Sequence, residues 1–137
     1  MRSREYKKVF NNLVRCRTFL YSILPPDRSK NEYCRKQKYT NWYKADSSHY
    51  YGISKSSYIK HQTIEVRMHH GTIEAQKIIN WINLLTKIVD YDKYLTNNIE
   101  SITKLDKTVG YDATVKEYVR EQKELVTKTK LEKRKNA

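Results

Sequence analysis

An alternating segment that leads through a turn into an amphipathic stretch constrains the fold of this chain most strongly. Within residues 58–68, polar and apolar side chains alternate from Thr63 onward, which is the period of a β-strand with one buried face. That period places Glu65 and Arg67 on one face of the strand. The other face carries Ile64, Val66 and Met68. We therefore predict a strand over residues 58–68.

An amphipathic helix is predicted directly after this strand. Gly71 supplies a tight turn, and Thr72 is placed to cap a helix that begins near Glu74. The apolar residues of the segment 74–89 form one stripe at helical spacing: Ile78, Ile79, Ile82, Leu85, Ile88 and Val89, widened by Trp81 and Leu84. We expect this helix to pack back onto a sheet that contains the strand.

A basic amphipathic helix is predicted over residues 4–24, because Pro25 and Pro26 forbid its continuation. Its apolar positions recur every three or four residues: Val9, Phe10, Leu13, Val14, Phe19, Leu20, Ile23 and Leu24. Two interpretations of its lysines and arginines stay open. They form an ordinary solvated face, or they dock the helix on nucleic acid or on a membrane surface.

The pattern weakens after Asp90. A short helix is predicted over residues 93–105 and a last helix over residues 113–134, with Gly110 between them. The last helix has few apolar positions, chiefly Val115, Val119, Leu125, Val126 and Leu131, and we expect it to be exposed or frayed. If its apolar side chains dock into a partner's groove, the chain is a structural or interaction subunit.

The charge balance favours acidic partners. Twenty-eight lysines and arginines against fifteen acidic residues give a net charge of +13, which attracts polyanions. Residues 25–57 also interleave tyrosines with basic side chains. That mixture can stack bases and bind phosphates, although tyrosine is equally favoured in strands. Nucleic-acid binding by a non-enzymatic basic protein is therefore the alternative function.

Two further patterns bear on location. No stretch approaches the roughly 18 apolar residues that span a bilayer, so we expect no membrane partner. Cys16 and Cys34 are isolated, which indicates neither a zinc site nor a disulfide framework. A reduced, cytoplasmic setting fits both patterns best.

The Glu65 and Arg67 side chains suit phosphoryl chemistry. A strand holds such a pair about 6.5 to 7 Å apart on one face. The carboxylate can hold a divalent cation that bridges phosphate oxygens, while the guanidinium neutralises charge on the phosphoryl group in transfer. An exposed glutamate beside an arginine can equally be a solvated ion pair of little energetic worth. The spacing alone leaves both interpretations open.

The wider context resembles a known family. Residues 63–72 followed by residues 77–82 resemble the signature of the amidoligases, a glutamine-synthetase-like family of carboxylate–amine ligases: T-x-E-x-R, a turn that ends in Gly-Thr, and a helix with a central Trp-Ile step. Pro26-Asp27-Arg28 with Tyr33-Cys34, and the segment His49–Ser54, are similar to two upstream pieces of the family. Order and spacing agree across roughly residues 10–91.

This resemblance implies ATP-dependent activation of a carboxylate to an acyl phosphate, and attack by an amine to form an amide or isopeptide bond. The substrates would be small-molecule or peptide carboxylates and amines. By the same resemblance, Glu65 would be a Mg²⁺ ligand and Arg67 would bind phosphate and stabilise the transition state. Arg28 would contact substrate or phosphate. His69 would donate to a phosphate of ATP, or it is a histidine of a surface turn.

The sequence also departs from the family. Residues 1–24 offer no counterpart to the family's amino-terminal half, which carries paired metal-binding glutamates and a His-x-His strand. His49 and Ser54 stand where the family tends to have arginine and asparagine. We therefore expect an incomplete ligase module that a partner polypeptide or a homo-oligomer completes, or a decayed relative kept for binding. An exposed sheet edge and an uncovered apolar face would favour such pairing.

The expected fold class is α+β. A small antiparallel sheet with packed helices would form half of a glutamine-synthetase-like fold, followed by a basic helical carboxy-terminal tail. Residues 1–92 would be the amidoligase-like module and residues 93–137 the helical basic extension.

Overall fold

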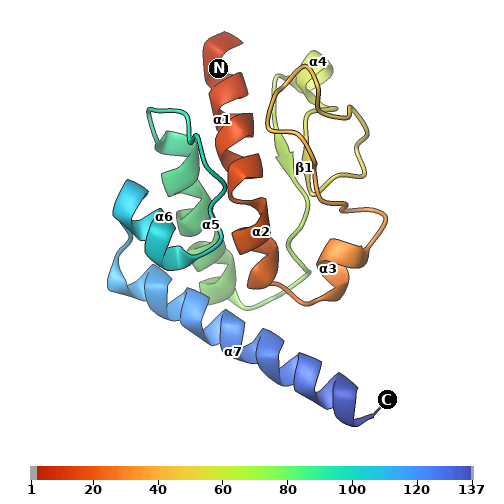
Figure 1. Cartoon of the computed structure of the whole chain (residues 1–137), viewed down its shortest axis with the longest axis vertical. Coiled ribbons are helices and arrows are strands. Elements are labelled where there is room, and N and C mark those ends of the chain that lie inside the picture. Colours follow the sequence, from red (N-terminus) through yellow and green to blue (C-terminus); the bar gives the residue numbers. More distant parts are fainter. Residues whose placement is uncertain (1–2, 137) are drawn as a thin grey trace.

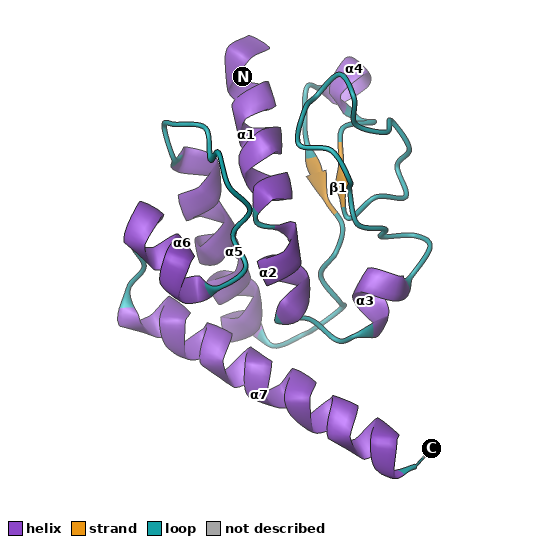
Figure 2. Cartoon of the chain, in the orientation of Figure 1, coloured by secondary structure: helices purple, strands orange, loops and turns teal. Residues whose placement is uncertain are grey.

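The computed structural model describes residues 3–136, and over these it combines helices with a small two-stranded antiparallel sheet (Figures 1 and 2). In chain order its elements are α1 (Ser3–Arg15), α2 (Arg17–Ser22), α3 (Asp27–Lys30), β1 (Ile53–Ser54), α4 (Tyr58–His61), β2 (Glu65–Val66), α5 (Ala75–Asp90), α6 (Ile102–Val109) and α7 (Ala113–Lys135). The predicted α+β class is confirmed at this level. No helix in the described part of the chain is long and apolar enough to cross a membrane.

Helices α1 and α2 form the centre of the molecule. Figure 1 shows α5 and α6 on one side of them, the strands and loops on the other, and α7 running across the base. All eight apolar positions predicted for this segment are buried. The segment is two helices and not one, because the Cys16 amide shares its hydrogen bond between the carbonyls of Asn12 (3.2 Å) and Leu13 (3.1 Å). The Arg17 guanidinium donates to the Val14 carbonyl at 2.7 Å beside this break.

The sheet is much shorter than predicted. Ile53 pairs with Val66 and Ser54 with Glu65, whereas the expected first half of the strand is the helical turn α4. The prediction of a strand over residues 58–68 was therefore wrong except near β2. The Tyr58 ring packs 3.9 Å from the Tyr6 ring, centroid to centroid, and this aromatic contact with α1 holds the turn in place.

Helix α5 confirms the predicted helix over residues 74–89 and packs between α1 and α7. Trp81, Leu84 and Ile88 are buried. Thr72 does not cap the helix, because Glu74 occupies that position; the Thr72 hydroxyl instead accepts a hydrogen bond from the Glu74 amide at 3.1 Å. Part of the predicted apolar stripe remains uncovered: Ile78, Ile79 and Ile82 are exposed.

The carboxy-terminal third differs from the prediction in two ways. The helix expected over residues 93–105 begins only at Ile102, since the preceding segment is extended across α1, where the Ile99 amide donates to the Arg15 carbonyl at 2.9 Å. The last helix has nearly its predicted bounds, but its first half is neither exposed nor frayed. Its buried side chains are Val115, Tyr118, Val119, Gln122 and Val126. They are already covered within this chain, which removes most of the apolar surface that a partner's groove would need.

A buried asparagine joins α1 to the segment that follows α5. The Asn12 side chain is fully buried, donates to the Lys93 carbonyl at 2.8 Å and accepts from the Leu95 amide at 2.8 Å. It also accepts from the Asn11 side-chain amide at 2.9 Å. Buried polar groups that lose their partner keep their full desolvation cost, so these contacts matter more than exposed ones.

We predict that Asn12→Ala lowers the free energy of unfolding by about 3 kcal/mol, because it leaves the Leu95 amide buried without its partner and removes the partly buried bond to the Lys93 carbonyl. Urea denaturation followed by circular dichroism measures the loss. Asn98→Ala is the matched control, since Asn98 is exposed and only accepts from Arg15 at 3.3 Å. Equal losses in both variants would contradict the role assigned to Asn12.

Candidate functional site

Glu65 and Arg67 form an ion pair at strand β2. The Arg67 Nε lies 3.5 Å from the Glu65 Oε1, and the two side chains are 30% and 45% exposed respectively. Met68, which follows Arg67, is fully buried. The predicted alternation therefore holds at this point: the charged pair lies on the accessible face and the apolar side chains face the core. Solvent reaches both charges, so the pair by itself contributes little to stability.

The segment around β1, residues 49–57, fixes both charged side chains. The Ser57 hydroxyl donates to the Glu65 Oε2 at 3.4 Å. The Arg67 guanidinium donates to the His49 carbonyl, and the Arg67 backbone amide donates to the Gly52 carbonyl at 2.7 Å. The segment around residues 49–57 thus sets the orientation of a carboxylate and a guanidinium that contact each other. Such a pair can receive an anion on the guanidinium and a cation on the carboxylate.

Arg28 reaches the same segment, but through the backbone. Its Nε donates to the Met68 carbonyl at 3.0 Å, and its Nη2 lies 3.4 Å from the Arg67 carbonyl and 3.5 Å from the His69 carbonyl. The Cys34 thiol in turn donates to the Arg28 carbonyl at 2.7 Å. Sequence reasoning placed Arg28 at the site. In the structure its guanidinium holds the chain that follows β2.

His69 and His70 form a stacked, half-buried pair between β2 and α5. Their ring centroids are 4.5 Å apart, and the His69 ring lies 4.8 Å from that of Trp81. The His69 Nδ1 is 2.5 Å from the His70 carbonyl, whereas the His69 Nε2 and the His70 Nδ1 are buried and have no hydrogen-bond partner among residues 3–136. Burial lowers the pKa of both rings, and the Arg28 and Lys77 charges lower it further. This is a packed pair and not a free surface turn.

Two residues that support the site were not singled out from the sequence. The Tyr21 hydroxyl donates to the Cys34 carbonyl at 2.5 Å and to the Arg35 carbonyl at 3.2 Å. Gly52 packs directly beneath that hydroxyl, since a Cβ added at Gly52 would lie 2.0 Å from it. A bulkier residue at 52 would displace the backbone whose carbonyl binds the Arg67 amide. The only sequence signal was a glycine within a tyrosine-rich loop.

The acidic side chains near Glu65 and Arg67 determine which metal site is possible there. No group of three or more histidine, cysteine or acidic side chains that could hold a metal ion is found among residues 3–136. Glu65 therefore offers a single carboxylate. Magnesium is commonly bound through one or two carboxylates together with substrate phosphates and waters, so Glu65 fits as one ligand of such an ion. A two-metal site needs further carboxylates.

The comparisons with known proteins address the same segment. Residues 37–89 match the model of a family described as "putative amidoligase enzyme". The match covers Glu65, Arg67, His69 and nearly all of α5, while Arg28 and α7 lie outside it. The resemblance to the amidoligases is confirmed over this stretch. No curated protein and no solved structure matches the chain.

We predict that the protein loses stability as the pH is lowered through the histidine range. An unfolded histidine binds a proton near pH 6.5, and the folded pKa values of His69 and His70 lie below this. Between the folded and unfolded values the unfolded chain binds more protons, so the free energy of unfolding falls with falling pH.

Urea denaturation at pH 7.5, 6.5 and 5.5 measures this slope, and the variant His69→Gln/His70→Gln should flatten it. His61→Gln is the control, because His61 is exposed on α4. A slope that the double variant leaves unchanged would show that other groups cause it.

Proposed function

We propose that this chain is an ATP-dependent carboxylate–amine ligase module whose site is built around Glu65 and Arg67. The proposal rests on one observation, that two results point to the same segment. The amidoligase family match spans residues 37–89, and within it the structure brings a glutamate and an arginine into contact on an accessible face. In this proposal the short sheet and α5 correspond to part of a glutamine-synthetase-like fold.

The proposed reaction has two steps, formation of an acyl phosphate and its attack by an amine. A substrate carboxylate oxygen attacks the γ-phosphorus of ATP, the bond to the β,γ-bridging oxygen breaks, and an acyl phosphate and ADP form. An amine then attacks the acyl carbon, phosphate leaves, and the amine's proton passes to solvent or to a base. The Arg67 guanidinium neutralises the charge that develops on the phosphoryl oxygens. Mg²⁺, with Glu65 as one ligand, would supply charge neutralisation across the phosphates.

Arg28 and His69 have supporting roles in this proposal. Arg28 holds the carbonyls of residues 67–69 and so fixes the path of the chain beside Arg67. Its three backbone contacts support a positioning role over direct contact with substrate. His69 lies at the end of the same chain, where its Nδ1 contacts the His70 carbonyl and its Nε2 is buried, so these contacts support a role in packing the chain beside Arg67 over direct contact with a phosphate.

A partner polypeptide that supplies further carboxylates would complete the site. Glu65 alone does not make the multi-carboxylate metal site of such ligases, and Ile73, Ile78, Ile79 and Ile82 are exposed on α5 and the turn before it. An apolar patch of this kind is typical of an interaction surface. With +13 on this chain, an acidic partner is electrostatically favoured over a second copy.

We predict that Glu65→Gln and Arg67→Lys each reduce the rate of ADP release by about 100-fold. The first removes the carboxylate charge, and the second removes the planar guanidinium that contacts the transferring phosphoryl group. ADP release is measured with the full chain, alone and as the co-purified assembly. Glu74→Gln is the matched control, since Glu74 also pairs with a cation, Lys77, at 3.5 Å but lies outside the site. Turnover that survives Glu65→Gln in the active assembly would exclude this proposal.

Nucleic-acid binding is the second candidate function, and one observation favours it. Four tyrosines of the loops between α3 and β1 are exposed to solvent: Tyr33, Tyr39, Tyr43 and Tyr50. Exposed rings among lysines and arginines are the ingredients of a stacking surface for single strands. Trp42 does not belong to it, because its ring packs against Tyr6, Phe10 and Tyr58.

We predict for this second candidate that Tyr33→Leu/Tyr39→Leu weakens binding of a single-stranded RNA about tenfold or more, since each stacked base contributes on that order. Affinity should fall linearly with salt on logarithmic axes and should not change in Glu65→Gln. Fluorescence anisotropy measures it, with Tyr94→Leu as the exposed-tyrosine control. Equal weakening by the control would argue against a defined stacking surface.

A further inference from the structure

A pocket of about 560 Å³ lies between α3 and the last turns of α7. Its lining comes from two segments that are far apart in the sequence: Pro26, Asp27, Lys30 and Asn31 from α3 and its flanks, and Lys130, Lys133 and Arg134 from α7. All of them lie outside residues 37–89, so the pocket is not part of the family match. Neither Glu65 nor Arg67 lines it, so the pocket is a separate site from that pair.

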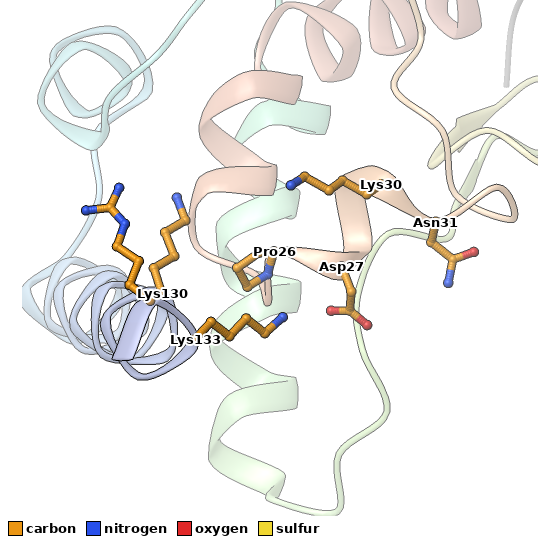
Figure 3. A pocket seen from close by; sticks show the side chains of 7 residues that line it. Pro26, Asp27, Lys30, Asn31, Lys130 and Lys133 are labelled. Carbon is orange, nitrogen blue, oxygen red and sulfur yellow. The ribbon is translucent and has the colours of Figure 1, made fainter. Parts of the chain in front are cut away.

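The walls of this pocket are strongly cationic. Four of its lining residues carry a positive charge, and Asp27 is the sole acidic one. None of the four takes part in an ion pair within the described chain, unlike Arg120 earlier in α7, which pairs with Glu117 and Glu124. Figure 3 shows Lys133 of α7 directed toward Pro26 and Asp27, and Lys30 of α3 directed toward α7. Unneutralised charges that converge on one hollow attract an anion.

An adjoining hollow of about 310 Å³ extends the cationic surface. It shares Pro26, Lys30 and Lys130 with the first pocket and adds Lys36 and the Ser29 side chain. The Lys36 amine lies 5.5 Å from the centroid of the Tyr21 ring, which keeps it over this hollow. Val126, buried one turn before Lys130, anchors the helix at the rim. The α7 cations of the pocket thus follow directly after Val126, the last buried residue of that helix.

Size and charge together indicate the ligand class. A volume of several hundred cubic ångströms suits a small molecule, and lysines bind phosphate as compact point charges. Five cations with one opposing carboxylate match a ligand with three or more negative charges. The converging arrangement, from both sides of a hollow, differs from the linear track that an extended strand requires.

We propose that this α3–α7 pocket binds an oligophosphate, either a free inorganic chain or the phosphate moiety of a nucleotide. Lys30 contacts it from α3, and Lys130 and Lys133 contact it from α7. The proposal does not depend on the ligase function, because the residues and the ligand contacts are different.

Isothermal titration of the full chain with inorganic tripolyphosphate, and separately with ATP, tests the proposal. Lys130→Gln/Lys133→Gln should weaken tripolyphosphate binding about tenfold or more, and Lys30→Gln should weaken it from the opposite wall. The matched control is Lys128→Gln/Lys135→Gln, which removes the same charge from exposed positions of α7 outside the pocket. Circular dichroism of every variant establishes that α7 is retained.

Each result decides the proposal. Selective loss of tripolyphosphate binding in the pocket variants, with binding unchanged in the Lys128→Gln/Lys135→Gln control, supports it. Competition between tripolyphosphate and ATP that is lost in Lys130→Gln/Lys133→Gln identifies the nucleotide's phosphates as the group recognised by the pocket, whereas tripolyphosphate binding without ATP competition identifies free oligophosphate. Equal losses in control and pocket variants overturn it, because binding then follows net charge alone. Binding of a single-stranded RNA without any tripolyphosphate binding overturns it as well.

Discussion

The burial of helices α1 and α2 on both sides is the constraint on which the rest of the structure depends. Phe10, Val14, Phe19, Leu20 and Ile23 are completely inaccessible, so one layer must cover each side of this pair of helices. On one side α5 and α6 supply that cover, and on the other the loops and the short sheet do. Because removing apolar surface from water is the main favourable term in folding, neither layer is dispensable.

Contacts with α2 and α3 position the candidate site more than the short sheet does. A sheet of two paired residues per strand is too small to hold a charged pair rigidly. The segment is instead held by Tyr21 of α2 above Gly52 and by Arg28 of α3, whose guanidinium binds the carbonyls after β2. Contacts between helix side chains and loop backbone therefore take the place of a wide sheet.

Sequence periodicity predicted the local features, namely helix bounds and the face of a side chain. Contacts between distant residues determined the features that it did not predict. The bounds of α5 and α7 followed from helical spacing, and the shared face of Glu65 and Arg67 followed from a period of two. The strand failed at Tyr58, where packing on Tyr6 favoured a helical turn over extension. Likewise the backbone contacts of Arg28 join residues about 40 positions apart, and no local pattern encodes such a contact.

The contact between Asn12 and residues 93–95 has a consequence for folding during translation. It joins residues more than 80 positions apart, and the amino-terminal helices find their cover only when α5 and that segment are present. On a ribosome, the apolar faces of α1 and α2 therefore emerge long before the residues that shield them. During synthesis, this chain therefore exposes apolar surface together with net positive charge on α1 and α2 until residues 93–95 have been translated.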